Sequence, residues 1–106
     1  MVCYKPIKLM DDSIFFEWDE NKARKNLAKH HVSFAQAARI FDDPHLITYP
    51  DRVVDGELRW HALGMAGGIV LLLVVHTLRE HNGAETIRII SARKATKTEE
   101  YRYEHG

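Results

Sequence analysis

The stretch that decides the fold is ELRWHALGMAGGIVLLLVVHTLREHNGAETIRIIS, residues 57–91. Residues 57–63 alternate between polar and apolar side chains, which predicts a strand with one buried face. Residues 69–77 are mostly apolar, and their longest apolar run is far shorter than the roughly 20 residues that cross a membrane, so they predict the central buried strand. Residues 86–91 predict a further strand. The glycine pair 67–68 and the strong hairpin signal Asn82-Gly83 separate these strands, so an antiparallel meander is expected.

Upstream of this stretch, the chain predicts a strand followed by a helix. Residues 14–18 are aromatic and apolar, as is typical of a strand. Asp19 fits an N-cap, and we expect the helix to cover about residues 20–29. Ala23 and Leu27 would lie on its buried face. The opposite face carries lysines: Lys22, Lys25 and Lys29.

A second helix and a short strand are predicted next. Ser33 and Gln36 match a capping box, and Pro44 ends the helix. The apolar stripe of this helix consists of Phe34, Ala37, Ala38 and Phe41. Residues 45–49 predict a strand, and residues 50–56 read as a polar turn.

The end of the chain predicts a final helix. Ser91 can cap a helix through residues 92–104, which places Arg93 and Lys94 in its first turn. Cations there oppose the helix dipole, a local cost that is expected where a site binds an anion. A solvated basic turn explains the same residues equally well.

These elements together predict an α+β fold. The expected order is one strand, two helices packed on a mostly antiparallel sheet of four further strands, and a C-terminal helix. One domain is expected over residues 14–106, with residues 1–13 as an N-terminal extension or with Met10 as the true start.

Composition excludes several classes of protein. The 106 residues hold 15 Lys and Arg against 15 Asp and Glu, so no global positive field suggests a histone-like or membrane-coating protein. A single cysteine, Cys3, permits neither an internal disulfide nor a CxxC zinc site. Because no signal peptide or membrane-spanning segment is apparent, the cytoplasm is the expected location.

The strand at residues 57–63 presents a chemically interesting face. Glu57, Arg59 and His61 alternate with Leu58, Trp60 and Ala62, which would form the buried side. A carboxylate can take up a proton, a guanidinium can bind phosphate through two donors, and an imidazole titrates near neutral pH. A solvated strand face with cross-strand pairs is the plainer alternative.

The Asn82-Gly83 hairpin, if its loop has two residues, fixes a register. Arg79 would then lie opposite Thr86, and Thr77 opposite Arg88, which makes that face polar and basic. His76 would lie opposite Ile89 on the other face, a position more typical of a core histidine than of a catalytic one.

Metal and nucleotide sites are not expected. Seven histidines are present, but no HxxxH, HExxH or His/Cys cluster appears, nor a Walker loop or a GxSxG elbow. The sequence therefore predicts no cofactor and no metal.

Several segments resemble the BrnT family of type II toxin–antitoxin toxins. They are FEWDENKARKNLAKHHVSFAQAARIF, GELRWHALG, VVHTLRE and IRIISARKATKTEEYRYE, in family order within residues 14–104. The most specific pieces are WDENK at residues 18–22 and RIISARKA at residues 88–95. Residues 1–13 fall outside the resemblance.

The resemblance implies a RelE-like fold and a ribonuclease toxin that blocks translation by cutting RNA. It also implies a BrnA-type antitoxin that forms a heterotetramer containing two antitoxin chains. The antitoxin is expected to supply the DNA contacts of this complex. RelE-like ribonucleases need no metal: the RNA 2′-hydroxyl attacks, a base removes its proton, cations stabilise the phosphorane and an acid protonates the leaving 5′-oxygen.

Roles follow for the residues of the predicted face. Glu57 is the expected base, and His61 or His76 the expected acid. The expected phosphate ligands are Arg59, Arg79 and Arg93. The residues expected to guide the RNA backbone are Arg88, Lys94 and Lys97.

Two other functions remain open. A non-catalytic module of the same fold, acting as a corepressor with its antitoxin, would use the basic face to bind an acidic antitoxin segment. A toxin that poisons DNA gyrase shares the fold, and no residue argues for it. Glu57 favours the enzyme, since a surface that only binds anions gains nothing from a carboxylate among arginines.

Overall fold

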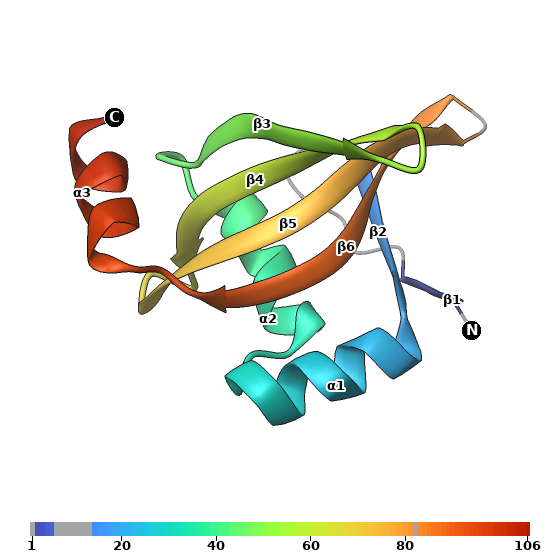
Figure 1. The fold of residues 1–106 in the computed structure, drawn as a ribbon, viewed down its shortest axis with the longest axis horizontal. Helices are drawn as coiled ribbons and strands as arrows, with labels where there is room; N and C mark the ends of the chain where they lie inside the picture. The colour runs from blue at the N-terminus through green and yellow to red at the C-terminus, as the bar shows by residue number, and fades with distance from the viewer. Residues whose placement is uncertain (1, 6–13, 82) are drawn as a thin grey trace.

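The computed structural model describes residues 2–5, 14–81 and 83–106; the candidate start at Met10 and the hairpin residue Asn82 lie outside these ranges. Figure 1 shows the arrangement of the elements. In chain order they are β1 (Val2–Lys5), β2 (Ile14–Asp19), α1 (Glu20–His30), α2 (Phe34–Ala38), the 3-10 helix η1 (Arg39–Asp42), β3 (Ile47–Val54), β4 (Glu57–Ala66), β5 (Val70–His81), β6 (Ala84–Lys94) and α3 (Lys97–His105).

All the described strands belong to one sheet, in the order β1-β2-β6-β5-β4-β3. The predicted antiparallel meander from β3 to β6 is confirmed. β2 lies parallel to β6, and β1 adds an antiparallel edge strand beside β2. The segment expected to be an extension thus contributes a strand to the sheet. No helix of the described ranges is long and apolar enough to cross a membrane.

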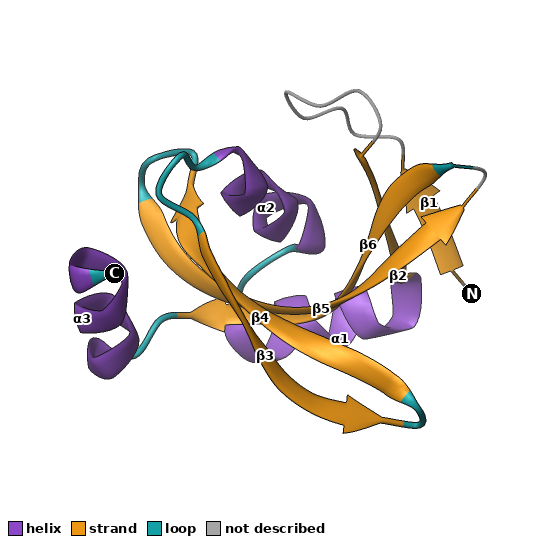
Figure 2. Ribbon diagram, turned by 90° about the horizontal axis from the view of Figure 1, so that it is seen from above, coloured by secondary structure: helices purple, strands orange, loops and turns teal. Residues whose placement is uncertain are grey.

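The helices divide the sheet into two faces. α1 and α2 pack against β6, and η1 packs against β4 on the same side, so the apolar core lies between them and the sheet. Figure 2 shows the sheet strongly twisted, with α3 set apart at one end. The largest fully buried apolar residues of this core include Phe16, Phe34, Ile40, Leu72 and Ile89. We name the face that α1 and α2 leave uncovered the open face.

The predicted alternation of β4 is confirmed, but its burial is only partly as expected. Pairing with β5 places Ala62 opposite the buried Val74, on the helix side. Leu58 on that side is 38% exposed, while Leu63 on the open face is fully buried. The helices reach β4 near Gly64, whose α carbon packs beside Ile40, and the beginning of the strand extends beyond them.

The polar turn predicted for residues 50–56 is wrong. β3 continues through Pro50 to Val54, and only Asp55 and Gly56 form the turn, both with positive φ (52° and 78°). Pro50 is tolerated because β3 is the edge strand, where a missing N–H breaks no ladder bond. A register shift between Pro50 and Val53 accommodates the extra length.

The final helix begins later than predicted. β6 runs on to Lys94, so Ser91 lies in a strand and Arg93 and Lys94 are not in a helical turn. α3 instead starts after Thr96, which forms a capping box with Glu99. The argument from cations opposing the helix dipole is therefore wrong for Arg93.

The first helix is confirmed, with its N-cap at Asp19, and its predicted buried face is confirmed only at Ala23, which packs against the core. Leu27 is 50% exposed, and the side chain buried against β6 is Asn26, at 7% exposure. Asn26 donates to the carbonyls of Ala92 (2.8 Å) and Val32 (3.0 Å) and accepts from the Ala92 N–H (3.1 Å). The pairing of β2 with β6 extends only to Arg88. The side chain of Asn26 therefore makes the hydrogen bonds to the backbone of Ala92 that a neighbouring strand would otherwise make.

Candidate active site

Charged side chains from four strands gather at one end of the open face. The carboxylate of Glu57 on β4 accepts two hydrogen bonds from Arg79 on β5, at 3.0 Å (Nε) and 3.3 Å (Nη2). Glu17 on β2 lies 3.8 Å from Nη1 of Arg79 and 3.9 Å from Nη1 of Arg88 on β6. We name these residues, Glu17, Glu57, Arg79 and Arg88, the acid–arginine cluster.

Within this cluster, Arg79 stabilises the ionised form of Glu57. The hydrogen bond from Arg79 is the main cause that lowers the pKa of Glu57, and the charges of Arg88 and Arg59 lower it further. The Arg79 and Glu57 side chains are 48% and 37% exposed, so their ion pair contributes little to stability. Arg79 can therefore exchange its carboxylate partner for another anion at small cost.

Two threonines lie beneath the acid–arginine cluster. The predicted register is confirmed, with Arg79 opposite Thr86 and Thr77 opposite Arg88. Both hydroxyl groups are buried and have no hydrogen-bond partner among the described residues. The sheet surface beneath the acid–arginine cluster is therefore polar.

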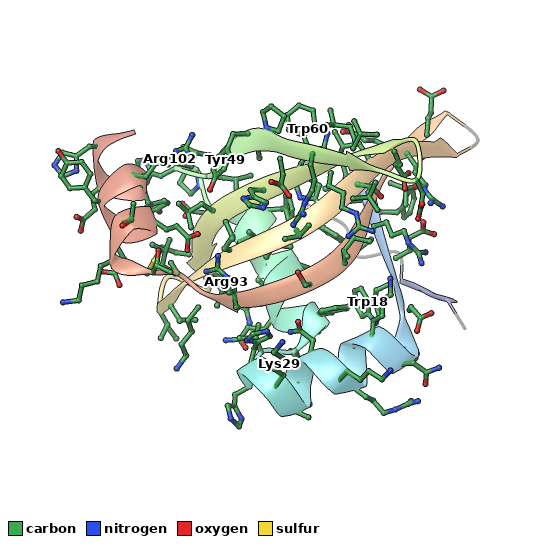
Figure 3. All side chains as sticks on the ribbon, viewed as in Figure 1. Trp18, Lys29, Tyr49, Trp60, Arg93 and Arg102 are labelled. Atoms are coloured by element: carbon green, nitrogen blue, oxygen red, sulfur yellow. The ribbon has the colours of Figure 1, made fainter. Side chains whose placement is uncertain are left out.

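A second group forms at the other end of the open face, around Tyr49 on β3. The ring of His61 meets the ring of Tyr49 edge-on at 5.3 Å, and its Nε2 lies 3.4 Å from Asp51. The guanidinium of Arg102 on α3 lies 3.7 Å from the centre of the Tyr49 ring. Figure 3 shows Tyr49 and Arg102 side by side, with Arg93 on β6. We name this group, Tyr49, His61, Arg93, Glu99 and Arg102, the Tyr49 cluster.

Arg93 is held within this cluster by Glu99. Its two terminal nitrogens donate to the two oxygens of that carboxylate, at 2.8 and 2.9 Å. This hydrogen bonding is the main cause that lowers the pKa of Glu99 and raises that of Arg93. The same carboxylate accepts from the Thr96 N–H at 2.8 Å, so it joins the first turn of α3 to β6.

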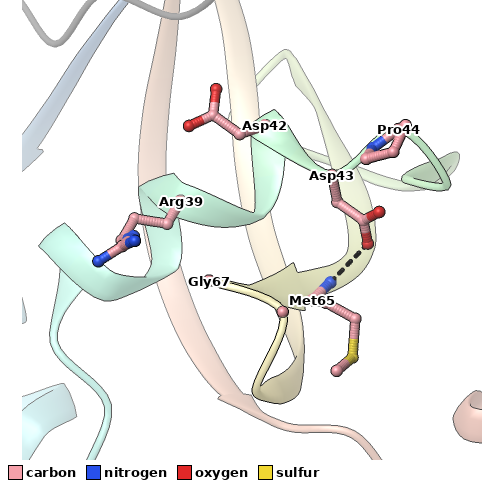
Figure 4. A pocket seen from close by; sticks show the side chains of 7 residues that line it. Arg39, Asp42, Asp43, Pro44, Met65 and Gly67 are labelled. Atoms are coloured by element: carbon pink, nitrogen blue, oxygen red, sulfur yellow. Dashed lines mark hydrogen bonds between the residues drawn. The ribbon is translucent and has the colours of Figure 1, made fainter.

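A pocket of about 270 Å³ between η1 and the turn that joins β4 to β5 contains none of the predicted site residues. Figure 4 shows Arg39, Asp43 and Met65 among its lining. Asp43 accepts from the N–H groups of Met65 (2.7 Å) and His45 (2.9 Å) and from the hydroxyl of Tyr103 on α3 (2.5 Å). Because these bonds occupy its carboxylate, Asp43 holds α3 and the end of β4 in place.

The structure brings most of the predicted residues together on the open face. Glu57, Arg79 and Arg88 lie in the acid–arginine cluster, with Arg59 beside Glu57 on β4, while His61 and Arg93 lie in the Tyr49 cluster. Lys94 and Lys97 are exposed, at the end of β6 and the start of α3. Among the described residues, no group of three or more His, Cys, Asp or Glu side chains converges as a metal site would.

A family model described as the ribonuclease toxin BrnT of type II toxin–antitoxin systems matches residues 18–99. This chain belongs to the BrnT family. The crystal structure of the ribonuclease toxin BrnT from Brucella abortus is similar, with 27% identity and a TM-score of 0.57. The match covers 76% of this chain and 94% of that one. No curated protein sequence matches the chain. Membership of a type II toxin family implies an antitoxin partner, as the sequence analysis expected.

His76 does not join the site of this BrnT-family chain. It lies opposite Ile89 on the helix side of the sheet, 2% exposed, with its ring edge-on to Phe41 at 5.3 Å. Burial lowers its pKa to about 4, so the ring is neutral at pH 7. The alternative of a core histidine is confirmed, and His76 is the wrong residue for the catalytic acid.

The burial of His76 makes the stability of the chain pH-dependent. The folded pKa of about 4 lies below the unfolded value of 6.5, so the unfolded chain binds the proton between these values. The stabilisation is complete above pH 6.5 and is lost as the pH falls toward 4. We expect the free energy of unfolding to drop by about 3 kcal/mol over this range. Urea unfolding at pH 7 and 4.5 measures the drop.

A matched pair of variants isolates this effect. His76→Leu removes the titrating group, so its stability should change much less between the two pH values. Thr98→Leu, at an exposed position that does not titrate, should leave the wild-type pH dependence unchanged. An equal drop in wild type and His76→Leu contradicts the assignment.

Four residues of the two clusters were not predicted from the sequence: Glu17, Tyr49, Glu99 and Arg102. Glu17 had a usable signal, since it stands between Phe16 and Trp18, and alternation places it on the opposite face from those two buried rings. Tyr49 meets His61 because β3 pairs with β4 in that register. Glu99 and Arg102 meet Arg93 and Tyr49 only because α3 folds back over the sheet, and no local pattern specifies those contacts.

Proposed function

We propose that this chain is an endoribonuclease that cuts RNA on the open face without a metal ion and thereby blocks translation. The observation that carries the proposal is the set of side chains that surround Glu57 on the open face. This carboxylate shares the open face of β4 with His61, and guanidinium groups from β5 and β6 stand around it. An acid, a base and phosphate ligands on one face are what cleavage by the RNA 2′-hydroxyl requires.

In this mechanism Glu57 removes the proton of the 2′-hydroxyl. The 2′-oxygen forms a bond to phosphorus, and the bond from phosphorus to the 5′-oxygen breaks. His61 donates the proton that the leaving 5′-oxygen takes up. The products are a 2′,3′-cyclic phosphate, or its hydrolysis product, and a 5′-hydroxyl.

Arg79 begins this reaction paired with Glu57. We infer that the scissile phosphate replaces that carboxylate on the guanidinium, which gives the phosphate two donors and releases the base. The lowered pKa of Glu57 keeps it ionised at neutral pH and therefore able to accept a proton. Hydrogen bonds of a free enzyme commonly rearrange in this way when substrate binds.

The remaining cations of the open face hold the RNA. Arg59 stands two residues from both Glu57 and His61 on the same strand face, suited to contact the same phosphate. Arg93 binds a neighbouring phosphate once its hydrogen bonds to the Glu99 carboxylate are broken. The residues that guide the backbone are Arg88, Lys94 and Lys97.

The partner and the wider fold family belong to the same proposal. We infer a RelE-like fold and a BrnA-type antitoxin, assembled as a heterotetramer, that neutralises the toxin by covering the open face. The antitoxin supplies the DNA contacts of the complex, since the toxin chain has no net charge.

RNA cleavage in the presence of EDTA tests the activity. The purified chain, incubated with total RNA and excess EDTA, should cut it and leave 2′,3′-cyclic phosphate and 5′-hydroxyl ends. End-labelling by polynucleotide kinase without prior phosphatase treatment detects the 5′-hydroxyl. Cleavage that stops in EDTA, or products with 5′-phosphate ends, contradicts the mechanism.

One observation favours the non-catalytic alternative, a binding module that acts as a corepressor with its antitoxin. Glu57 and Glu99 are each already paired with an arginine, as in a purely structural network. On that account a folded chain leaves RNA intact, and expression does not arrest growth. The EDTA experiment therefore decides between the two functions.

A further inference from the structure

A groove lined by lysines runs between α1 and the edge of β6. Its volume is about 220 Å³. The residues that line it are Lys22, Lys25, Asn26, Lys29, His30, Ile90 and Ser91. Spacings of three and four residues place the three lysines on one side of α1, above one another. The groove is separate from both clusters of the candidate active site.

The charge of α1 departs from that of the whole chain. The helix holds four cationic side chains, Lys22, Arg24, Lys25 and Lys29, against the single carboxylate of Glu20, a net of +3 in a chain whose formal charge is zero. The three lysines are exposed, and within the described residues no carboxylate pairs with any of them. Like charges at these spacings repel, so the helix alone gains nothing from the arrangement.

The groove meets the open face at Ser91. This residue lies opposite Val75 on β5, and Arg93 follows two positions later on the same face. Asn26, between the lysines, bonds to both backbone groups of Ala92, which fixes α1 against β6 at this point. Figure 3 shows Lys29 on α1 below Arg93 on β6. A chain bound across the open face can therefore continue into the groove.

We propose that this groove binds the phosphate backbone of the RNA beyond the cleaved bond. The inference rests on the proposed function for its choice of RNA. From Lys22 to Lys29 the helix rises about 10 Å, at about 1.5 Å per residue, which is long enough to contact more than one phosphate of an RNA strand. Lysines in a row suit such a series of point charges.

A protein partner fits the groove less well. Protein interfaces depend on apolar and aromatic anchors at their centre, and among the described residues Ile90 alone is an apolar residue that lines this groove. Lysine is depleted from such centres. The lining instead has the composition of a phosphate-binding channel, which holds a backbone and reads no base.

Binding of a 2′-O-methyl RNA oligonucleotide tests the groove apart from catalysis, because the probe lacks the attacking hydroxyl. The variant Lys25→Gln/Lys29→Gln should bind it at least tenfold more weakly at low salt. The slope of log K against log salt should fall by about 1.4, since about 0.7 is lost for each phosphate contact of a single strand. Fluorescence anisotropy across a salt series measures both.

A charge-matched control is Arg24→Gln/Arg39→Gln, which removes two cations that do not line the groove. This control should keep the wild-type slope. The proposed groove is overturned if both double variants weaken RNA binding equally. It is also overturned if Lys25→Gln/Lys29→Gln binds RNA as wild type does, even where that variant loses antitoxin binding.

Cleavage of unmodified RNA by the same wild-type preparation separates the two proposals. A chain that binds the probe through Lys25 and Lys29 but cuts no RNA refutes the ribonuclease and leaves the groove standing. A chain that cuts RNA while both double variants bind normally refutes the groove alone. Far-UV circular dichroism of each variant checks that its overall secondary structure matches that of the wild type.

Discussion

Replacing Arg79 with alanine is expected to lower the rate of RNA cleavage by about 100-fold or more. Arg79 is the residue that joins the candidate base to the rest of the site, with two hydrogen bonds to Glu57 and a close approach to Glu17. In the proposed reaction it stabilises the charge that develops on the phosphorane, and loss of one such donor typically costs 100- to 1,000-fold in rate. Single-turnover cleavage of a labelled RNA measures the loss.

Two further variants make this result specific. Arg79→Lys keeps the charge but not the two-pronged geometry, so it should recover only part of the rate. Arg24→Ala removes an exposed arginine on α1 and should cut RNA at the wild-type rate. Because the Arg79–Glu57 pair is well exposed, all three variants should keep wild-type stability to within about 1 kcal/mol. Full activity of a folded Arg79→Ala protein contradicts the site.

Replacing Asn26 with leucine is expected to lower the free energy of unfolding by about 3 kcal/mol or more. The substitution leaves the N–H and carbonyl of Ala92 and the carbonyl of Val32 without their bonds to Asn26. Each unpaired buried polar group costs about 1–3 kcal/mol. Leucine is similar in size to asparagine, so the loss reports mainly the hydrogen bonds. Urea unfolding at pH 7 gives the value.

The exposed Asn21 on the same helix provides the control. Asn21→Leu should change the free energy of unfolding by no more than about 0.5 kcal/mol, as is usual at surface positions. If Asn26→Leu costs less than about 1 kcal/mol, Asn26 does not replace a neighbouring strand at the edge of β6.

The parts of the fold that could be predicted depend on local signals. Asp19 and Ser33 cap their helices as expected, because a cap acts within one turn. The register of β5 and β6 followed from the length of the hairpin loop alone. The same local logic was available at Asp55-Gly56 and Thr96, where the sequence analysis instead extended a turn and a helix too far.

The parts that could not be predicted depend on contacts between distant segments. An asparagine in an exposed-looking helix gives no sign that it will bond to Ala92, 66 residues away. Tyr103 likewise meets Asp43 across 60 residues. The sequence of α3 does not predict that Glu99 binds Arg93, because the helix has no buried face of its own.

The candidate site shows the same division. Glu57, Arg59 and His61 share one face because strand alternation is a local rule. Arg79 joins them through the pairing of β4 with β5, whose register was not predicted from the sequence. His76 was offered as the acid although the predicted register of β5 and β6 put it on the opposite face. Tyr49 and Arg102 required the tertiary structure, since they come from an edge strand and from the last helix.

The rate of RNA cleavage by wild type and by Glu57→Gln, measured side by side in EDTA, tests the central claim most directly. Glutamine keeps the size of the side chain but cannot take up the proton. Glu100→Gln, at an exposed position on α3, serves as the matched control. The account predicts that wild type and the control cut RNA at the same rate and that Glu57→Gln is at least about 100-fold slower. Equal rates for all three proteins would contradict it.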